Sequence, residues 1–161
     1  MPLKNSATRW GSVSMGLHWL VVALILLMAW IGLRMGDMPN GPDKIATYAL
    51  HKSVGISILA LAVVRLAWRA VAGAPGHVAG TPAWQARIAT LAHVALYALL
   101  LAIPLSGWVV NSSAGFPLQW FGLFNLPAIA GKDQGLHAFA EQLHEWLFWT
   151  LVLVAVAHAA A

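Results

Sequence analysis

The sequence predicts an all-α membrane protein, a four-transmembrane-helix bundle that residues 1–161 form as a single domain. Of these residues, 60% are hydrophobic and only 9% are charged, whereas a soluble domain usually has about 25% charged residues. Four stretches reach the length of about 20 mostly apolar residues that a helix needs to cross a bilayer. The nine tryptophans agree with this class, because indole rings anchor helices at the membrane–water interface.

The first two predicted spans end at residues that break helices. The first covers about 14–35 and stops at "GDMPNGP", and the second covers about 48–71 and stops at "AGAPG". Proline and glycine interrupt the helical pattern, so each motif favours a turn after the span.

The later part of the chain contains two more spans and an interrupted aromatic segment. The third span covers about 86–110, and we expect Pro104 to kink it. The segment 115–127 is aromatic but broken by prolines, so we expect it to lie on the bilayer surface. The fourth span covers about 136–161.

Composition also excludes several classes of site and partner. The chain has no cysteine, which excludes disulfides, thiolate metal sites, iron–sulfur clusters and haem attached through C-x-x-C-H. The formal net charge of +4 is small and comes from scattered residues, so we expect no nucleic-acid partner. The lipid bilayer is the partner that the composition predicts.

Four spans put both termini on one side of the membrane. That side carries the basic residues of the amino-terminal arm and of the second connection, namely Lys4, Arg9, Arg65, Arg69 and Arg87. The other side carries all five acidic residues and the remaining basic residues, namely Arg34, Lys44, Lys52 and Lys132. An excess of Lys and Arg marks the cytoplasmic side. The charge pattern therefore predicts cytoplasmic termini.

The fourth span carries two histidines, His144 and His158, in an otherwise almost purely apolar stretch. Their separation of fourteen residues turns a helix by about 1400°, which is about 40° short of four full turns. Both side chains therefore lie on one face of the helix, separated by roughly 21 Å along its axis. This face presents two histidines at two depths in the membrane.

Each of these histidines has a counterpart at its own depth. His18 begins the first span, which enters from the side of the termini, so it is level with His158. His51 begins the second span, which enters from the opposite side, so it is level with His144. Paired imidazoles on facing helices are how a helical bundle holds haem b. The sequence thus predicts two haems b per chain, held without covalent bonds.

Small residues near these histidines favour the same interpretation. Gly16, Gly55 and Ala155 would let a porphyrin approach the helix backbone. Two alternatives remain open: a zinc or proton-relay site, and histidines that serve only as hydrogen-bonding residues between helices. A zinc or relay site would need ligands at one depth or carboxylates deep inside the spans, whereas the acidic residues within them, Glu141 and Glu145, are near the outer end of the fourth span.

Basic residues near the predicted haems are candidates for pairing with propionates. Arg65 follows His51 by fourteen residues, so it shares that helical face at the depth of the cytoplasmic haem. An arginine fork matches a carboxylate, and we expect Arg65 to bind a propionate there. We expect Arg69 to lie at the surface. Lys52, beside His51, either pairs with an outer propionate or stays on the exposed face.

The other histidines have weaker signals. His93 and Tyr97, four residues apart on the third span, either bond a propionate or a quinone or simply pack that helix. His137 lies on the face of His144 but at or beyond the membrane surface, too far out to replace it. We expect His77 to be a solvated loop residue.

The helices resemble, in order and over nearly the whole chain, the bacterial cytochrome b561 family, whose best-known members are superoxide oxidases. The matching segments are "GLHWLVVALIL", "LHKSVGISILALAVVRLAWR", "LAHVALYALLLAIPLSGW", "FPLQWFGLFNLP" and "LHEWLFWTLVLVAVAHAAA". In that family the four matching histidines ligate two haems b: His18 with His158, and His51 with His144. Chains of the family usually continue past the last ligand in a polar stretch, whereas this sequence ends at Ala161. We therefore assign no quinone-site residue.

The resemblance implies an oxidoreductase of the bacterial inner membrane. Such an enzyme oxidises periplasmic superoxide to dioxygen at the outer haem and passes the electron through the inner haem to ubiquinone. Arg34 and Lys52 are the candidates for steering the superoxide anion, with Lys44 and Lys132 available nearby.

The principal alternative is a cytochrome b anchor subunit that links a periplasmic dehydrogenase or hydrogenase to the quinone pool. The predicted outer connections have about 12 and 25 residues, which leaves little surface for docking. They favour an enzyme that does not require an obligate protein partner. A third possibility is a membrane scaffold without redox activity.

Overall fold

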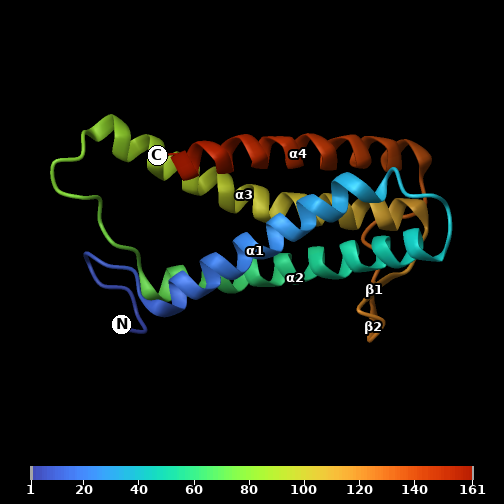
Figure 1. Cartoon of the computed structure of the whole chain (residues 1–161), viewed down its shortest axis with the longest axis horizontal. Coiled ribbons are helices and arrows are strands. Elements are labelled where there is room, and N and C mark those ends of the chain that lie inside the picture. Colours follow the sequence, from blue (N-terminus) through green and yellow to red (C-terminus); the bar gives the residue numbers. More distant parts are fainter. Residues whose placement is uncertain (1, 161) are drawn as a thin grey trace.

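Four long helices and one small hairpin make up the computed structural model, which describes residues 2–160. The elements are α1 (Ser12–Met35), α2 (Pro42–Ala72), α3 (Ala83–Ala114), β1 (Leu118–Trp120), β2 (Phe124–Leu126) and α4 (Gln134–Ala160). All four helices are long and apolar enough to cross a membrane. The prediction of a four-helix membrane bundle is therefore confirmed, and both ends of the chain lie at the same end of the bundle (Figure 1).

All four helices begin before their predicted spans, α1 by two residues at Ser12. Helix α2 begins at Pro42, well before the predicted residue 48, because proline suits the first position of a helix. Helix α3 extends the predicted span at both ends and continues through Pro104. Helix α4 begins at Gln134, and the predicted end of its span at Ala161 lies outside the described residues.

The segment that we expected to lie flat on the bilayer forms an antiparallel hairpin instead. Strands β1 and β2 pair Leu118 with Leu126 and Trp120 with Phe124, and the hairpin projects beside α2 (Figure 1). At its turn Phe121 has a φ of 47°, a conformation that is rare for a bulky residue. Ser53 on α2 stabilises this turn, because its Oγ accepts the backbone N–H of Phe121 at 2.9 Å.

The helices pack as two pairs, α1 with α2 and α3 with α4, which the α2–α3 contact joins. Among the described residues, α4 makes close backbone contact with α3 alone. The buried core lies between α1, α2 and α3 and contains Val21, Val54, Ile58, Ala62 and Leu100. The side of α4 that faces α1 and α2 therefore borders open space rather than another helix backbone.

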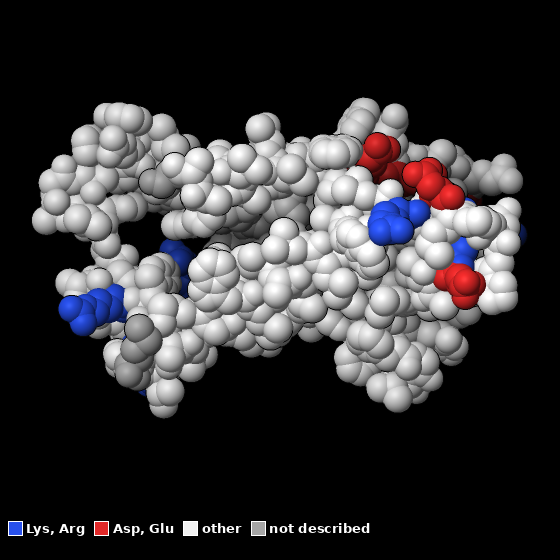
Figure 2. Space-filling model, in the orientation of Figure 1, with Lys and Arg blue, Asp and Glu red and all other residues white. Residues whose placement is uncertain are grey.

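Charged residues are sorted between the two ends of the bundle. On the face shown in Figure 2, acidic side chains gather at the end opposite the termini, where lysine and arginine accompany them. At the end with the termini, the charged side chains that this face shows are all basic. This distribution follows the predicted division of charges.

Removing the Ser53 hydroxyl should loosen the hairpin. In the variant Ser53→Ala the N–H of Phe121, a half-exposed residue, loses its hydrogen bond to Ser53, which costs about 0.5–1.5 kcal/mol, and we expect a lower unfolding temperature in detergent by circular dichroism. Thr90→Ala is a matched control, since Thr90 and Ser53 each bond the carbonyl four residues earlier, while the hydroxyl of Ser53 alone also bonds the hairpin. Equal unfolding temperatures for the two variants would contradict this role of Ser53.

Candidate functional site

Two cavities lie between the helix pairs at different depths along the bundle. We call the first the His18 cavity, which has a volume of about 290 Å³ and lies toward the termini. We call the second the His51 cavity, which has a volume of about 390 Å³ and lies toward the hairpin. Ile25, Leu100 and Leu151 line both cavities and separate them as an apolar partition.

In the His51 cavity, one histidine of α2 faces one histidine of α4. The ring centroids of His51 and His144 are 6.2 Å apart and the ring planes meet at 70°. This separation is too long for a hydrogen bond between the rings and leaves space between them. Within the described part of the chain, the two residues come from helices that make no close backbone contact with each other.

Hydrogen bonds determine which nitrogen of His144 carries the proton. Its Nδ1 lies 3.0 Å from the carbonyl oxygen of Ile103 and 2.9 Å from Ser106 Oγ. A carbonyl can only accept, so Nδ1 is the protonated donor and Nε2 keeps its lone pair. This tautomer is the one that a histidine needs in order to bind a metal through Nε2.

His51 presents a polar atom without a partner. Its Nδ1 is buried and has no hydrogen bond within residues 2–160. A buried polar atom left unpaired costs about 1–3 kcal/mol, so such an atom in a cavity is a sign of a missing partner. The facing imidazole of His144 fits a metal-centred ligand between the rings, whereas the orphaned Nδ1 of His51 lies beside Gly32 of α1, where an added Cβ would be 3.9 Å from it.

Two glycines allow these histidine rings to lie close to helix backbones. A Cβ added at Gly107 of α3 would be 3.1 Å from Cε1 of His144, and one added at Gly32 of α1 would be 3.4 Å from Cε1 of His51. The small residues predicted from the sequence are in more open surroundings. A Cβ at Gly16 meets nothing within 4 Å, and one at Gly55 meets only a flexible methionine methyl group.

The two predicted steering residues are in different surroundings. Lys52 lines the His51 cavity, and its Nζ donates to Oδ1 of Asn111 at 3.1 Å. Arg34 is exposed at the end of α1, stacked 5.0 Å above the Trp30 ring, and does not line that cavity. Of the two, Lys52 therefore brings the positive charge to the edge of the cavity.

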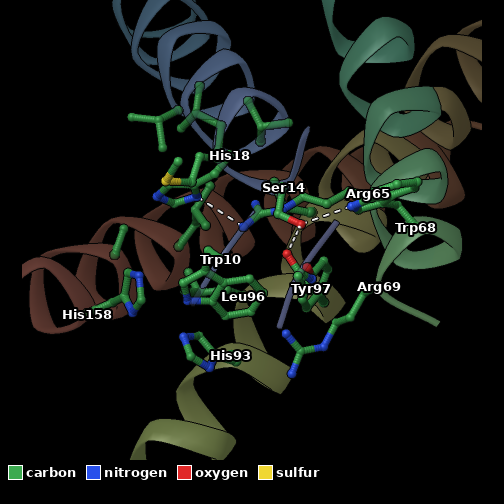
Figure 3. Close-up of a pocket in the computed structure, with 18 residues that line it drawn as sticks. Trp10, Ser14, His18, Arg65, Trp68, Arg69, His93, Leu96, Tyr97 and His158 are labelled. Atoms are coloured by element: carbon green, nitrogen blue, oxygen red, sulfur yellow. Dashed lines mark hydrogen bonds between the residues drawn. The ribbon is translucent and has the colours of Figure 1, made fainter. Parts of the chain in front are cut away.

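The His18 cavity contains three histidines rather than two. His18 of α1, His158 of α4 and His93 of α3 all point into it (Figure 3). The rings of His93 and His158 are 5.2 Å apart at an angle of 68°. Of the two roles left open for His93, the structure favours one at the cavity over simple packing of α3.

Two arginines of α2 reach into the same cavity. Arg65 donates a hydrogen bond from Nη2 to Nδ1 of His18 at 3.0 Å (Figure 3). Its guanidinium also lies 5.3 Å from the centre of the Tyr97 ring. The prediction that Arg69 lies at the surface is wrong, because Arg69 lines the cavity between Trp10 and Tyr97.

The amino-terminal segment forms a wall of the His18 cavity, which the sequence did not predict. Asn5 donates to the carbonyl of Gly73 at 2.7 Å and accepts from Ser14 Oγ at 2.7 Å. Ser14 in turn accepts from Nε1 of Trp68 at 2.9 Å. These bonds attach the segment before α1 to the start of α1 and to the end of α2, and they carry Trp10 into the cavity lining.

The remaining histidines lie away from both cavities. His137 bonds the carbonyl oxygen of Val110 through Nδ1 at 3.1 Å and lines neither cavity, in agreement with its predicted position. His77 is an exposed loop residue, as expected.

The predicted iron ligands are pairs of histidines, and the described residues form no larger cluster of metal-binding side chains. Within residues 2–160, no group of three or more His, Cys, Asp or Glu side chains comes together in a way that could hold a metal ion. A structural zinc site needs four protein ligands and a catalytic one usually needs three. Pairs of histidines that line each cavity fit haem better than they fit zinc.

Comparison with known proteins agrees with this chemistry. The family model described as "Prokaryotic cytochrome b561" matches residues 9–161. The chain is 34% identical to "Cytochrome b561 homolog 2" of Escherichia coli (strain K12), over 98% of this chain and 85% of that protein. It is 31% identical to "Cytochrome b561 homolog 1" of the same organism, over 95% of this chain and 87% of that protein.

The match extends over nearly the whole chain, and the four membrane helices with their histidine-lined cavities suit a haem protein. The chain therefore belongs to the prokaryotic cytochrome b561 family of multi-pass membrane proteins, b-type cytochromes that bind haem b and transfer electrons.

Proposed function

We propose that the chain holds two haems b and transfers electrons from periplasmic superoxide to ubiquinone. The observation that carries this proposal is the pair of histidine-lined cavities at two depths of one bundle, separated by a thin apolar partition. His51 and His144 hold the outer haem, and His18 and His158 hold the inner one. Haem b supplies a one-electron carrier at each depth.

The ligand sets support electron transfer rather than oxygen binding at iron. Two histidine ligands at each site would leave a haem iron no open position for a substrate, so the group would carry electrons. Ile103 orients His144 through its carbonyl, and Gly107 and Gly32 give the two rings of the outer site their space. Leu100 and Leu151 exclude water between the cavities.

The proposed substrates balance in electrons and protons. Each superoxide anion loses one electron and leaves as dioxygen, and two such electrons with two protons convert ubiquinone into ubiquinol. Lys52 at the edge of the His51 cavity and Arg34 on the nearby surface attract the anion, because opposite charge raises the rate of encounter. Arg65 of the inner site pairs with a haem propionate.

The proposed orientation in the bacterial inner membrane has both termini in the cytoplasm. The basic end of the bundle supports it, since the residues of the amino-terminal arm and of the helix ends that flank the 73–82 connection carry Lys and Arg without acidic residues. The His51 cavity then opens toward the periplasm, where superoxide is met.

The alternative of an anchor subunit is less well supported by the connections at the hairpin end. Only residues 36–41 join α1 to α2, and residues 118–126 of the 115–133 connection fold as a hairpin whose first strand packs against α2. The 36–41 connection is too short to offer the roughly 800 Å² that a stable protein interface needs on each side, which leaves the hairpin, with its exposed Phe121, Leu123 and Phe124, as the surface for a periplasmic partner.

Purified protein should contain two haems b per polypeptide by the pyridine haemochrome assay. His18→Ala or His158→Ala should halve the haem content by removing one spectral component, and His51→Ala or His144→Ala should remove the other. One haem or none in the unmodified chain would contradict the proposal. So would loss of the same component from both His18→Ala and His51→Ala.

Filling the space beside His144 should remove the outer haem alone. In Gly107→Val the new Cβ would be 3.1 Å from the imidazole Cε1, so the ring must move, and we expect about half of the haem to be lost with the inner component unchanged. Gly16→Val is the control, because a Cβ there meets nothing within 4 Å. Full haem content in Gly107→Val would show that the ring position does not matter.

Superoxide generated outside spheroplasts should reduce the haem, and a ubiquinone analogue should reoxidise it. The superoxide step should slow as salt rises, because the Debye length is about 10 Å at 0.1 M ionic strength, while reoxidation by a neutral quinone should change little. Arg34→Gln with Lys52→Gln should mimic high salt. Lys4→Gln with Arg87→Gln, which removes equal charge at the other end, should not.

Stopped-flow absorbance with superoxide dismutase as control measures this step. Reduction that dismutase does not suppress, or reduction only by a co-purifying dehydrogenase, would favour the anchor subunit. Reduction only when superoxide is generated on the cytoplasmic side of inverted vesicles would contradict the orientation.

A further inference from the structure

We propose that Arg65 is a latch on His18 that makes the His18 cavity selective for porphyrins with free carboxylates. The inference rests on the proposed dihaem function and adds a rule for how the inner site is loaded. It starts from a contact that the function did not require, namely a guanidinium bonded directly to a histidine that must ligate iron.

The donor and acceptor in this contact are fixed by chemistry. Nη2 of Arg65 and Nδ1 of His18 are 3.0 Å apart, and a guanidinium has five N–H donors and no acceptor. Nδ1 must therefore offer its lone pair to Arg65. In the neutral imidazole the single ring proton is then on Nε2.

This state of His18 conflicts with ligation of iron through Nε2. Ligation needs the Nε2 lone pair, so the ring proton must move from Nε2 to Nδ1, with no change in the charge of the imidazole. A protonated Nδ1 would face the N–H of Arg65, donor against donor. Arg65 must therefore leave His18 before His18 can hold a haem.

The cavity itself offers Arg65 no anion to move to. Among residues 2–160, its lining contains two arginines, three histidines and no aspartate or glutamate. Arginine is always charged and needs an acceptor where water is scarce. An anionic acceptor can therefore come only with the ligand, since Asn5, Ser14 and Tyr97 of the lining offer neutral oxygens, and a carboxylate matches the guanidinium fork. A haem propionate both draws Arg65 away and frees Nδ1 of His18.

The His51 cavity has no such obstacle among its described residues. Nδ1 of His144 already donates to the Ile103 carbonyl, which leaves Nε2 ready for iron. The lysine of that cavity, Lys52, bonds Asn111 rather than a histidine. The outer site should therefore accept a porphyrin whether or not it carries free carboxylates, and it should fill first when haem is scarce.

The test compares two iron porphyrins, haemin and haemin dimethyl ester, whose propionates are methylated. Each is titrated into membranes that contain the full chain, prepared from cells starved of haem, and the two low-spin components are followed by absorbance and electron paramagnetic resonance. Spectra of His18→Ala and His144→Ala loaded with haemin identify the component of each site. We expect both sites to bind haemin, with the outer site filling first.

The ester should bind the outer site normally but the inner site at least about tenfold more weakly than haemin does, since a hydrogen bond to a charged group is among the stronger ones. In Arg65→Met the latch is absent, and this preference for haemin should fall to nearly equal binding. Arg69→Met is the matched control, because Arg69 lines the same cavity one turn further along α2 without bonding His18. It should keep the preference.

The possible failures are distinct. Equal binding of both porphyrins at the inner site of the unmodified chain would overturn the latch and leave the dihaem proposal standing, and in this comparison the variants His18→Ala and His144→Ala serve only to assign the two spectra. An unchanged preference in Arg65→Met would also overturn it. If neither porphyrin gives a low-spin spectrum at either site, the dihaem proposal itself fails.

Discussion

The separation of α4 from α1 and α2 is the constraint on which the rest of the molecule depends. In a bilayer, lipid tails are as apolar as leucine, so helices associate through close packing and hydrogen bonds rather than through the hydrophobic effect. Within residues 2–160, α4 packs closely only against α3, and its side toward α1 and α2 borders the two cavities. A flat ligand between the helix pairs would supply the contacts that the backbones do not make. In the proposed dihaem function, the histidines of α4 would therefore contribute to the packing of the bundle as well as to its chemistry.

One spacing recurs on all four helices and explains how two sites fit one bundle. Fourteen residues separate His18 from Gly32, His51 from Arg65, His93 from Gly107, and His144 from His158. Fourteen residues return a helix to nearly the same face about 21 Å further along. Each helix thus contributes one residue of such a pair to each cavity. The contribution is a ligand candidate, a charge, or a glycine that makes room for the ligand of a neighbouring helix.

The sequence predicted what depends on position along a helix and missed what depends on contacts across the bundle. Depth follows from the fixed rise per residue, so the pairing of His18 with His158 could be proposed from the spacing of the histidines. The glycines beside the rings were not selected from the sequence, because only the contacts across the bundle distinguish them from other glycines. The same spacing of fourteen residues nevertheless links Gly107 to His93. The hairpin was missed because its turn depends on Ser53 from another element. The wall that the amino-terminal segment gives the His18 cavity was missed because it depends on the hydrogen bonds of Asn5.

The partition between the cavities bears on the energetics of the proposed electron transfer. Ile25, Leu100 and Leu151 have no group that can bind or release a proton, so an electron that crosses this layer moves without a compensating proton inside it. In the proposed orientation the electron travels toward the negative side of the membrane. Moving one charge across the full membrane costs about 2.3 kcal/mol per 100 mV, and crossing only the partition costs a fraction of that. The basic residues of the inner cavity, Arg65 and Arg69, oppose this cost because positive charge favours the reduced carrier. In the proposed function, Arg65 and Arg69 together would help to set the direction of transfer, and Arg65 alone would also control the loading of the site.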